Sequence, residues 1–152
     1  MDYTGQTILL VEDSDDDVFI FRRTAKIAGI ANPIQVVCEG EEALAYLGGT
    51  GPYADRKAHP VPFLLFLDLK LPQLSGLDIL QWIREQPQLS EVSVVVLTSS
   101  AEERDIVRAY QLGARSYLVK PPTGASLIEV LQAIQTSASV RERLRITGAK
   151  TG

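Results

Sequence analysis

Five side chains that could bind a cation or a phosphoryl group follow directly after apolar runs or end them. Three are carboxylates, Glu12, Asp13 and Asp68; the others are the hydroxyl of Thr98 and the ammonium of Lys120. If the runs are parallel strands, their carboxyl ends meet at one edge of the sheet, where functional groups of such sheets collect. The sequence therefore predicts one polar site at that edge.

Three carboxylates at one sheet edge repel, at roughly 4 kcal/mol for a pair ~4 Å apart in a medium of effective dielectric ~20. A bound proton or a cation must offset this repulsion. Mg²⁺ fits, because it takes oxygen ligands and keeps waters that a phosphate can replace. With one His and one Cys in the chain, no ligand cluster favours a softer metal. A carboxylate beside Mg²⁺ and Lys120 can accept a phosphoryl group, because the cations neutralise charge on the transferred group.

Each of these residues taken alone has a simpler explanation. An Asp after a strand is usually a turn or helix cap, Thr98 a capping hydroxyl, and Lys120 a solvated surface residue. We interpret Asp15, Asp16 and Asp17 as purely structural charges that favour the start of a helix through its dipole. The joint occurrence of the other residues at four strand ends favours the functional interpretation.

The elements that must position this site alternate along the chain. Apolar runs cover Thr7–Val11, Ile34–Cys38, Phe63–Leu67, Val92–Leu97 and Ser116–Val119. Segments with helical periodicity follow them, within residues 18–28, 41–47, 77–83, 102–112 and 123–134. Nearly continuous apolar runs are typical of parallel strands covered on both faces. The order predicts an α/β fold of (βα)5 type, a doubly wound five-stranded parallel sheet.

Composition excludes several other classes of protein. The chain has 152 residues, which suits one domain, and its formal net charge of −4 gives no electrostatic footprint for nucleic acid. The acidic excess lies in the first twenty residues, because the remaining 132 carry 15 basic and 13 acidic residues. No apolar run approaches the ~20 residues of a membrane span, and no secretory pattern opens the chain. We therefore expect a cytoplasmic protein that binds neither membrane nor nucleic acid, with Cys38 as a small buried core residue.

The motif residues together resemble the receiver domain of response regulators in two-component signalling. The matching segments are Leu9–Asp13, Leu67–Pro72 with Gly76, Leu97–Ser100, Gly113–Ala114 and Tyr117–Pro121. The resemblance extends over about residues 6–137. It implies a flavodoxin-like receiver fold with strand order 2-1-3-4-5.

The resemblance also implies a role for each residue of the site. Asp68 would accept a phosphoryl group from a phosphohistidine on a sensor histidine kinase. Asp13 and Asp68 would bind Mg²⁺, Glu12 would act on it through water, and the main-chain carbonyl of Lys70 would complete the metal site. Lys120 would bridge to the phosphoryl oxygens.

A second group of residues would switch or modulate the site. By the resemblance, Thr98 would move toward the phosphoryl group, Tyr117 would swing inward behind it, and the Lys120–Pro121 bond would be cis. The Lys70 side chain and Ser100 would flank the route of attacking water. We expect Lys70 to change the lifetime of the acyl phosphate; the alternative is that it points to solvent and has no effect.

The long connection over residues 48–62 resembles response regulators paired with phytochromes in cyanobacteria and other bacteria, which implies a bacterial phytochrome kinase as partner. We expect a receiver domain over residues 1–138 and a C-terminal extension over 139–152, with no output domain. The extension and the face formed by the fourth helix, fifth strand and fifth helix would pair two copies of the chain. The alternative for the extension is a frayed, solvated helix end.

Two other functions stay open. A phosphohydrolase with an Asp nucleophile could use a similar sheet, but the haloacid-dehalogenase type needs a second Asp where Lys70 stands. A receiver could also work without phosphorylation, although the presence of Asp13, Asp68, Thr98 and Lys120 argues against it. The favoured prediction is a single-domain response regulator that catalyses only its own phosphorylation and dephosphorylation.

Overall fold

The apolar runs of the sequence become the strands of one parallel sheet. The computed structural model describes residues 3–99 and 102–146, with side chains up to Ser137. The strands are β1 (Ile8–Val11), β2 (Ile34–Val37), β3 (Leu64–Asp68), β4 (Ser93–Thr98) and β5 (Ser116–Val119). The helices are α1 (Asp15–Ile27), α2 (Gly40–Gly48), α3 (Gly76–Arg84), α4 (Glu103–Gln111) and α5 (Gly124–Ile146), with short 3-10 turns η1 (Gly51–Tyr53) and η2 (Pro87–Leu89).

The strand order across the sheet is β2-β1-β3-β4-β5, and every neighbouring pair is parallel. This confirms the predicted fold and strand order. The register pairs Val11 of β1 with Leu67 of β3, and Asp68 of β3 with Leu97 of β4. The last residues of these strands therefore reach the same edge of the sheet.

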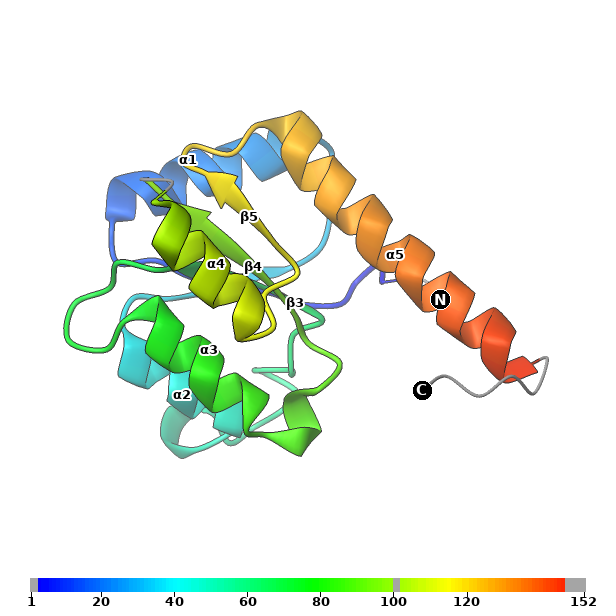
Figure 1. Ribbon diagram of the computed structural model, residues 1–152, viewed down its shortest axis with the longest axis horizontal. Coiled ribbons are helices and arrows are strands. Elements are labelled where there is room, and N and C mark those ends of the chain that lie inside the picture. The colour runs from blue at the N-terminus through cyan, green and yellow to red at the C-terminus, as the bar shows by residue number, and fades with distance from the viewer. Residues whose placement is uncertain (1–2, 100–101, 147–152) are drawn as a thin grey trace.

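Alternate residues of each central strand enter two separate cores. Leu9 and Val11 pack with buried residues of α2, α3 and α4 on one face, and Ile8 and Leu10 pack with residues of α1 and α5 on the other. Figure 1 shows these two helical layers on either side of the strands. Because both faces are covered, the central strands need apolar side chains along nearly their whole length, and the sequence departs from this only at the ends of β3 and β4.

Capping residues fix where the helices that border the site begin. Ser14 caps α1 by accepting a hydrogen bond from the Asp17 main-chain N–H at 3.3 Å. Ser75 and Asp78 form a reciprocal capping box at the start of α3. Thr123 caps α5 by accepting a hydrogen bond from the Ser126 main-chain N–H at 3.0 Å.

The fifth helix is longer than its apolar stripe predicted. It continues to Ile146, so the predicted boundary between residues 138 and 139 falls inside α5. No helix in the described part of the chain is both long enough and apolar enough to cross a membrane.

The long connection between α2 and β3 is held by polar contacts with α2. The Arg56 guanidinium donates to the main-chain oxygens of Tyr46 at 2.6 Å and Leu47 at 2.8 Å, which are carbonyls of the last turn of α2. Tyr46, Tyr53 and His59 contact one another ring to ring beside it. Arg56 thereby supplies donors to carbonyls at the end of α2, where helices leave acceptors free; the Tyr46 oxygen also accepts from the Gly49 N–H at 3.2 Å.

Candidate functional site

The predicted polar residues meet at the carboxyl edge of the sheet. Glu12 follows β1, Asp68 ends β3, Thr98 ends β4 and Lys120 follows β5. Two main-chain hydrogen bonds extend the ladders past the strands: Glu12 N–H to the Val37 oxygen at 3.0 Å, and Lys120 N–H to the Thr98 oxygen at 2.8 Å. These bonds fix the backbone of both charged residues at the edge.

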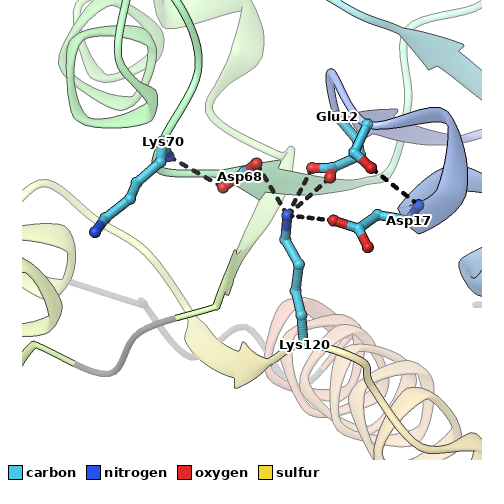
Figure 2. Close-up of polar contacts among 6 residues, drawn as sticks. Glu12, Asp17, Asp68, Lys70 and Lys120 are labelled. Atoms are coloured by element: carbon cyan, nitrogen blue, oxygen red, sulfur yellow. Dashed lines mark hydrogen bonds and ion pairs between the residues drawn. The ribbon is translucent and has the colours of Figure 1, made fainter.

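The Lys120 ammonium is the centre of the site. Its Nζ lies 2.7 and 3.0 Å from the two carboxylate oxygens of Glu12 and 3.0 Å from Oδ2 of Asp68. Figure 2 shows it pointing into the group of carboxylates. The exposed fractions of the side chains are 13% for Lys120, 2% for Glu12 and 6% for Asp68. Charge-assisted hydrogen bonds of this kind, screened from water, are about twice as strong as neutral ones.

Asp17 also contacts Lys120, which sequence reasoning missed. Its Oδ2 lies 3.1 Å from Lys120 Nζ, and its side chain is 40% exposed. Asp17 lies in the first turn of α1, as its interpretation as a helix-start charge requires, but the contact with Lys120 was not expected; the Asp15 and Asp16 side chains form no hydrogen bond or ion pair with another described side chain. The signal lay in the N3 position of a helix that starts beside the site, because N3 side chains reach back toward the helix N-terminus.

The electrostatics of the site follow from burial and from the crowding of charges. Burial, together with hydrogen bonds to the carboxylates of Asp68 and Asp17, raises the pKa of Glu12 from its ordinary 4.5 to about 8 against the opposing effect of Lys120. Burial alone would lower the pKa of Lys120, but its bonds to Glu12 and Asp68 hold that pKa above the ordinary value. Hydrogen bonding with Glu12 and then the charge of Lys120 lower the pKa of Asp17. Without a second cation, the group of acids therefore retains a proton on Glu12 near neutral pH.

The same carboxylates fit a divalent cation. One oxygen each from Glu12, Asp13 and Asp68 lies within 4.8 Å of the others. Glu12 and Asp68 are buried and Asp13 is exposed, so the group is open to water on the Asp13 side. An all-oxygen donor set with room for water is what Mg²⁺ and Mn²⁺ prefer. A divalent ion here would displace the proton on Glu12 and offset the repulsion among the three acids.

The backbone around Asp68 is held tightly. The main-chain N–H of Lys70 donates to Asp68 Oδ1 at 3.0 Å, which orients the carboxylate toward Lys120. Gly76, at the start of α3, packs directly on this segment, and its N–H donates to the Leu69 oxygen at 3.0 Å. A Cβ at Gly76 would lie 2.7 Å from the Leu69 Cα and closer still to the main-chain oxygen of Asp68. Only glycine therefore fits behind the acceptor strand at this position.

The other predicted residues lie around the site without entering it. Thr98 is buried at the end of β4. The Lys70 side chain points away from Asp68 in Figure 2 and is largely exposed, with its Nζ 3.9 Å from Glu102 Oε1. Tyr117 is partly exposed and packs edge-on against Tyr110, with ring centroids 6.4 Å apart. Ser100 lies outside the described residues.

Two further predictions have clear outcomes. The Lys120–Pro121 peptide bond is cis, as the resemblance implied. The expectation that Cys38 is a buried core residue was wrong, because Cys38 is exposed. It lies just past Val37, the last residue of β2, at the outer edge of the sheet, where no further strand covers it.

Comparison with known sequences and structures gives the family. A sequence profile of the response regulator receiver domain matches residues 8–132. The response regulator Rcp1 of Synechocystis sp. is 34% identical over 131 residues, covering 86% of this chain and 87% of Rcp1. The Mn²⁺-bound form of Rcp1 has a TM-score of 0.70 to this chain, over 86% of this chain and 92% of that one, at 34% identity.

Two other solved structures agree with this assignment. The bacteriophytochrome response regulator AtBRR has a TM-score of 0.76 at 38% identity, covering 86% of this chain and 92% of its own. The phosphorylated cyanobacterial phytochrome response regulator RcpA has a TM-score of 0.72 at 32% identity, covering 86% and 91%. From its sequence, its sheet topology and its acidic edge, the chain belongs to the response regulator receiver domain family.

Proposed function

We propose that this protein is a phosphorylation-dependent signalling switch in which Asp68 accepts a phosphoryl group from a sensor histidine kinase. The observation that carries the proposal is the contact of the Lys120 ammonium with the Asp68 carboxylate inside a group of acids that fits a divalent cation. The same arrangement serves the self-catalysed removal of the group by water. The protein then acts through contacts with other proteins and not as an enzyme on an outside substrate.

In the transfer step, a carboxylate oxygen of Asp68 attacks the phosphorus of a phosphohistidine. The new P–O bond forms as the P–N bond to the imidazole breaks, and the imidazole leaves with the bonding electron pair. Asp13, Asp68 and the Lys70 main-chain carbonyl would hold Mg²⁺, with Glu12 acting through water, and the ion would supply charge neutralisation on the transferred group. The Lys120 ammonium supplies a further positive charge directly beside Asp68. Both charges favour the transition state, in which negative charge spreads over the phosphoryl oxygens.

Thr98 and Tyr117 are the switch residues, which convert phosphorylation of Asp68 into a change of the protein surface. Thr98 is buried at the end of β4 next to the acceptor strand, so its hydroxyl is within the same edge as the phosphoryl group. Movement of Thr98 toward that group leaves room for Tyr117, which starts from a partly exposed position against Tyr110. We assign to Lys70 an effect on the lifetime of the acyl phosphate through its positive charge near this edge, and the same modulating role to Ser100, which lies outside the described residues.

Three relatives support the choice of metal and kinase. Rcp1 is described with bound Mn²⁺, which favours a divalent cation in this chain too, and Mg²⁺ is the abundant ion with the same ligand preference. AtBRR and RcpA are described as phytochrome response regulators, which favours a bacterial phytochrome as the kinase. A phytochrome kinase, like the absence of a membrane-spanning helix among the described residues, is compatible with a cytoplasmic location.

A homodimer through α4, β5 and α5 is part of the proposal. Val107 and Tyr110 of α4 and Tyr117 and Val119 of β5 are exposed apolar residues on this face. Helix α5 adds a long continuation toward the extension of residues 139–152, which we assign to the same interface while residues 1–138 form the receiver domain. Strand β5 lies at the end of the strand order, with no further strand beside it among the described residues, which leaves this side for a second copy.

Oligomeric state tests the interface. Val107→Glu, on α4, should keep the protein monomeric in sedimentation at tens of micromolar, because it places a charge in the apolar face. Ile27→Glu is the matched control, since Ile27 is an exposed apolar residue on α1. A wild-type protein that stays strictly monomeric with and without phosphorylation would contradict the dimer.

Intact-mass analysis tests the central proposal. After incubation with Mg²⁺ and a small acyl-phosphate donor, the wild type should gain one phosphoryl group, and Asp68→Asn should gain none. Omission of Mg²⁺ should suppress the gain. No gain in the wild type would favour a receiver that works without phosphorylation, and rapid multiple turnover on unrelated phosphoesters would favour a phosphohydrolase.

A further inference from the structure

Lys120 has a contact that the phosphoryl-transfer chemistry does not require. Besides Glu12 and Asp68, its ammonium contacts Asp17 of α1 at 3.1 Å, as Figure 2 shows. Asp17 is not among the acids whose oxygens gather for a cation. The Asp17 carboxylate can therefore affect the site only through its contact with Lys120 or through its proximity to Glu12.

The number of hydrogens on the ammonium limits how many partners it can serve. A lysine ammonium donates three hydrogen bonds, and three carboxylates surround Nζ within 2.7–3.1 Å. A phosphoryl group on Asp68 adds oxygens that need a donor from the same ammonium. The ammonium therefore has no spare hydrogen for a phosphoryl oxygen while all three carboxylate contacts persist.

Asp17 is the partner that can leave most easily. Glu12 is held at 2.7 Å and is 2% exposed, so loss of Lys120 would leave a buried acid without its cation. Asp68 carries the phosphoryl group itself and stays beside Lys120. Asp17 is 40% exposed and lies in the first turn of α1, where water and the helix dipole stabilise its charge without Lys120.

Electrostatic repulsion between Asp17 and the phosphoryl group also weakens the contact between Asp17 and Lys120, as competition for hydrogen bonds does. Phosphorylation replaces the single charge of the Asp68 carboxylate with about −2 on the phosphoryl group. The Asp17 carboxylate accepts a hydrogen bond from the same Nζ and repels this added charge. Both effects make Asp17 favour the unphosphorylated protein.

We propose that Asp17 is a positioning residue that holds Lys120 in the unphosphorylated protein and gives up this contact to a phosphoryl oxygen, so that it opposes phosphorylation. The inference rests on the proposed role of Asp68 as acceptor. It predicts that removal of the Asp17 charge strengthens the phosphorylated state, a gain that damage to the fold cannot produce.

Beryllofluoride, which binds an aspartate as an analogue of the phosphoryl group, tests this at equilibrium. Its dissociation constant is measured by fluorine NMR at a Mg²⁺ concentration that saturates each variant. Asp17→Asn should bind about two- to fivefold more tightly than the wild type, the range expected when a half-exposed ion pair is removed. Asp17→Glu, which keeps the charge, should stay close to the wild type.

Asp16→Asn is the matched control. It removes the same charge from the same helical turn, and the Asp16 side chain forms no hydrogen bond or ion pair with a described residue. The inference is overturned if Asp17→Asn binds equally or more weakly than the wild type, or if Asp16→Asn reproduces its gain. If neither the wild type nor Asp68→Asn binds beryllofluoride, the acceptor role of Asp68 fails together with the inference. If the wild type binds it and Asp17→Asn has the same affinity, only the inference is overturned.

Discussion

Replacement of Lys120 by methionine tests the electrostatic account of the site most directly. Methionine keeps most of the length of the side chain and removes the ammonium. It leaves the carboxylates of Glu12 and Asp68, which are nearly buried, without the cation that lies 2.7–3.0 Å from them. The variant should lose stability in a manner that depends on pH and on metal.

The magnitude follows from the state of Glu12. Removal of one partner from a buried ion pair costs about 3–5 kcal/mol when the other charge stays buried. We expect this cost at pH 9 in the metal-free protein, because Glu12, with its pKa near 8, is then ionised. At pH 6 Glu12 holds a proton, fewer charges lose their cation, and the cost should fall to about 2 kcal/mol. Saturating Mg²⁺ should reduce the cost at both pH values, because the ion takes over part of the neutralisation.

Urea unfolding in EDTA and in Mg²⁺ measures these free energies for wild type and variant. Lys70→Met is the matched control, because Lys70 is an exposed lysine at the same edge with a single contact 3.9 Å away. Its cost should stay within about 1 kcal/mol under every condition. A loss for Lys120→Met that is no larger at pH 9 than at pH 6, or that Mg²⁺ leaves unchanged, would refute the reasoning.

Four further predictions address the metal site, the acceptor backbone and the long connection. Because the folded-state pKa of Glu12 lies near 8 and its ordinary value is 4.5, the metal-free protein should lose stability as pH rises from about 4.5 through 8, seen in urea titrations. Mg²⁺ affinity measured by calorimetry should rise by up to about tenfold per pH unit below 8, because the metal displaces that proton; a flat profile would contradict it. Gly76→Ala should cost about 1–3 kcal/mol and slow phosphorylation by an acyl-phosphate donor, because its Cβ would press on the acceptor backbone, whereas Gly113→Ala at an open turn should only lose stability. Arg56→Met should cost about 1–3 kcal/mol in urea unfolding by removing the donor to the Leu47 carbonyl, with an unchanged phosphorylation rate; a slower rate would mean that the connection acts on the site.

The periodicity of the sequence was sufficient to predict most of the fold. Apolar residues at nearly every position of residues 7–11 and 63–67 record burial on both faces, and burial of both faces requires helices on both sides of a parallel sheet. The far end of α5 was not predicted, because its apolar stripe fades before the helix does. Periodicity reports which residues are covered and carries no information on how far a helix continues beyond its apolar stripe.

The exposure of Cys38 was also missed because the pattern of the sequence does not show which elements cover a residue. Its residue type and its place at the end of an apolar run favoured burial, but burial at that position depends on whether another strand or helix lies over it. The strand order puts β2 at the edge of the sheet, and Cys38 falls one residue past the last paired residue of that edge. The strand order entered the prediction through family resemblance, and its consequence for this side chain was visible only in three dimensions.

The sequence by itself determined the chemical content of the site. Acids at the ends of the first and third strands, a hydroxyl at the fourth and an ammonium at the fifth are brought to one edge by any parallel sheet with these strands adjacent. Only the tertiary structure decided how one ammonium is shared: Lys120 contacts Glu12 and Asp68, and also Asp17 from the start of α1. The physical reason is that the sharing depends on distances of a few ångströms between three segments distant in sequence, and these distances follow from how α1 and β5 pack around the strands between them.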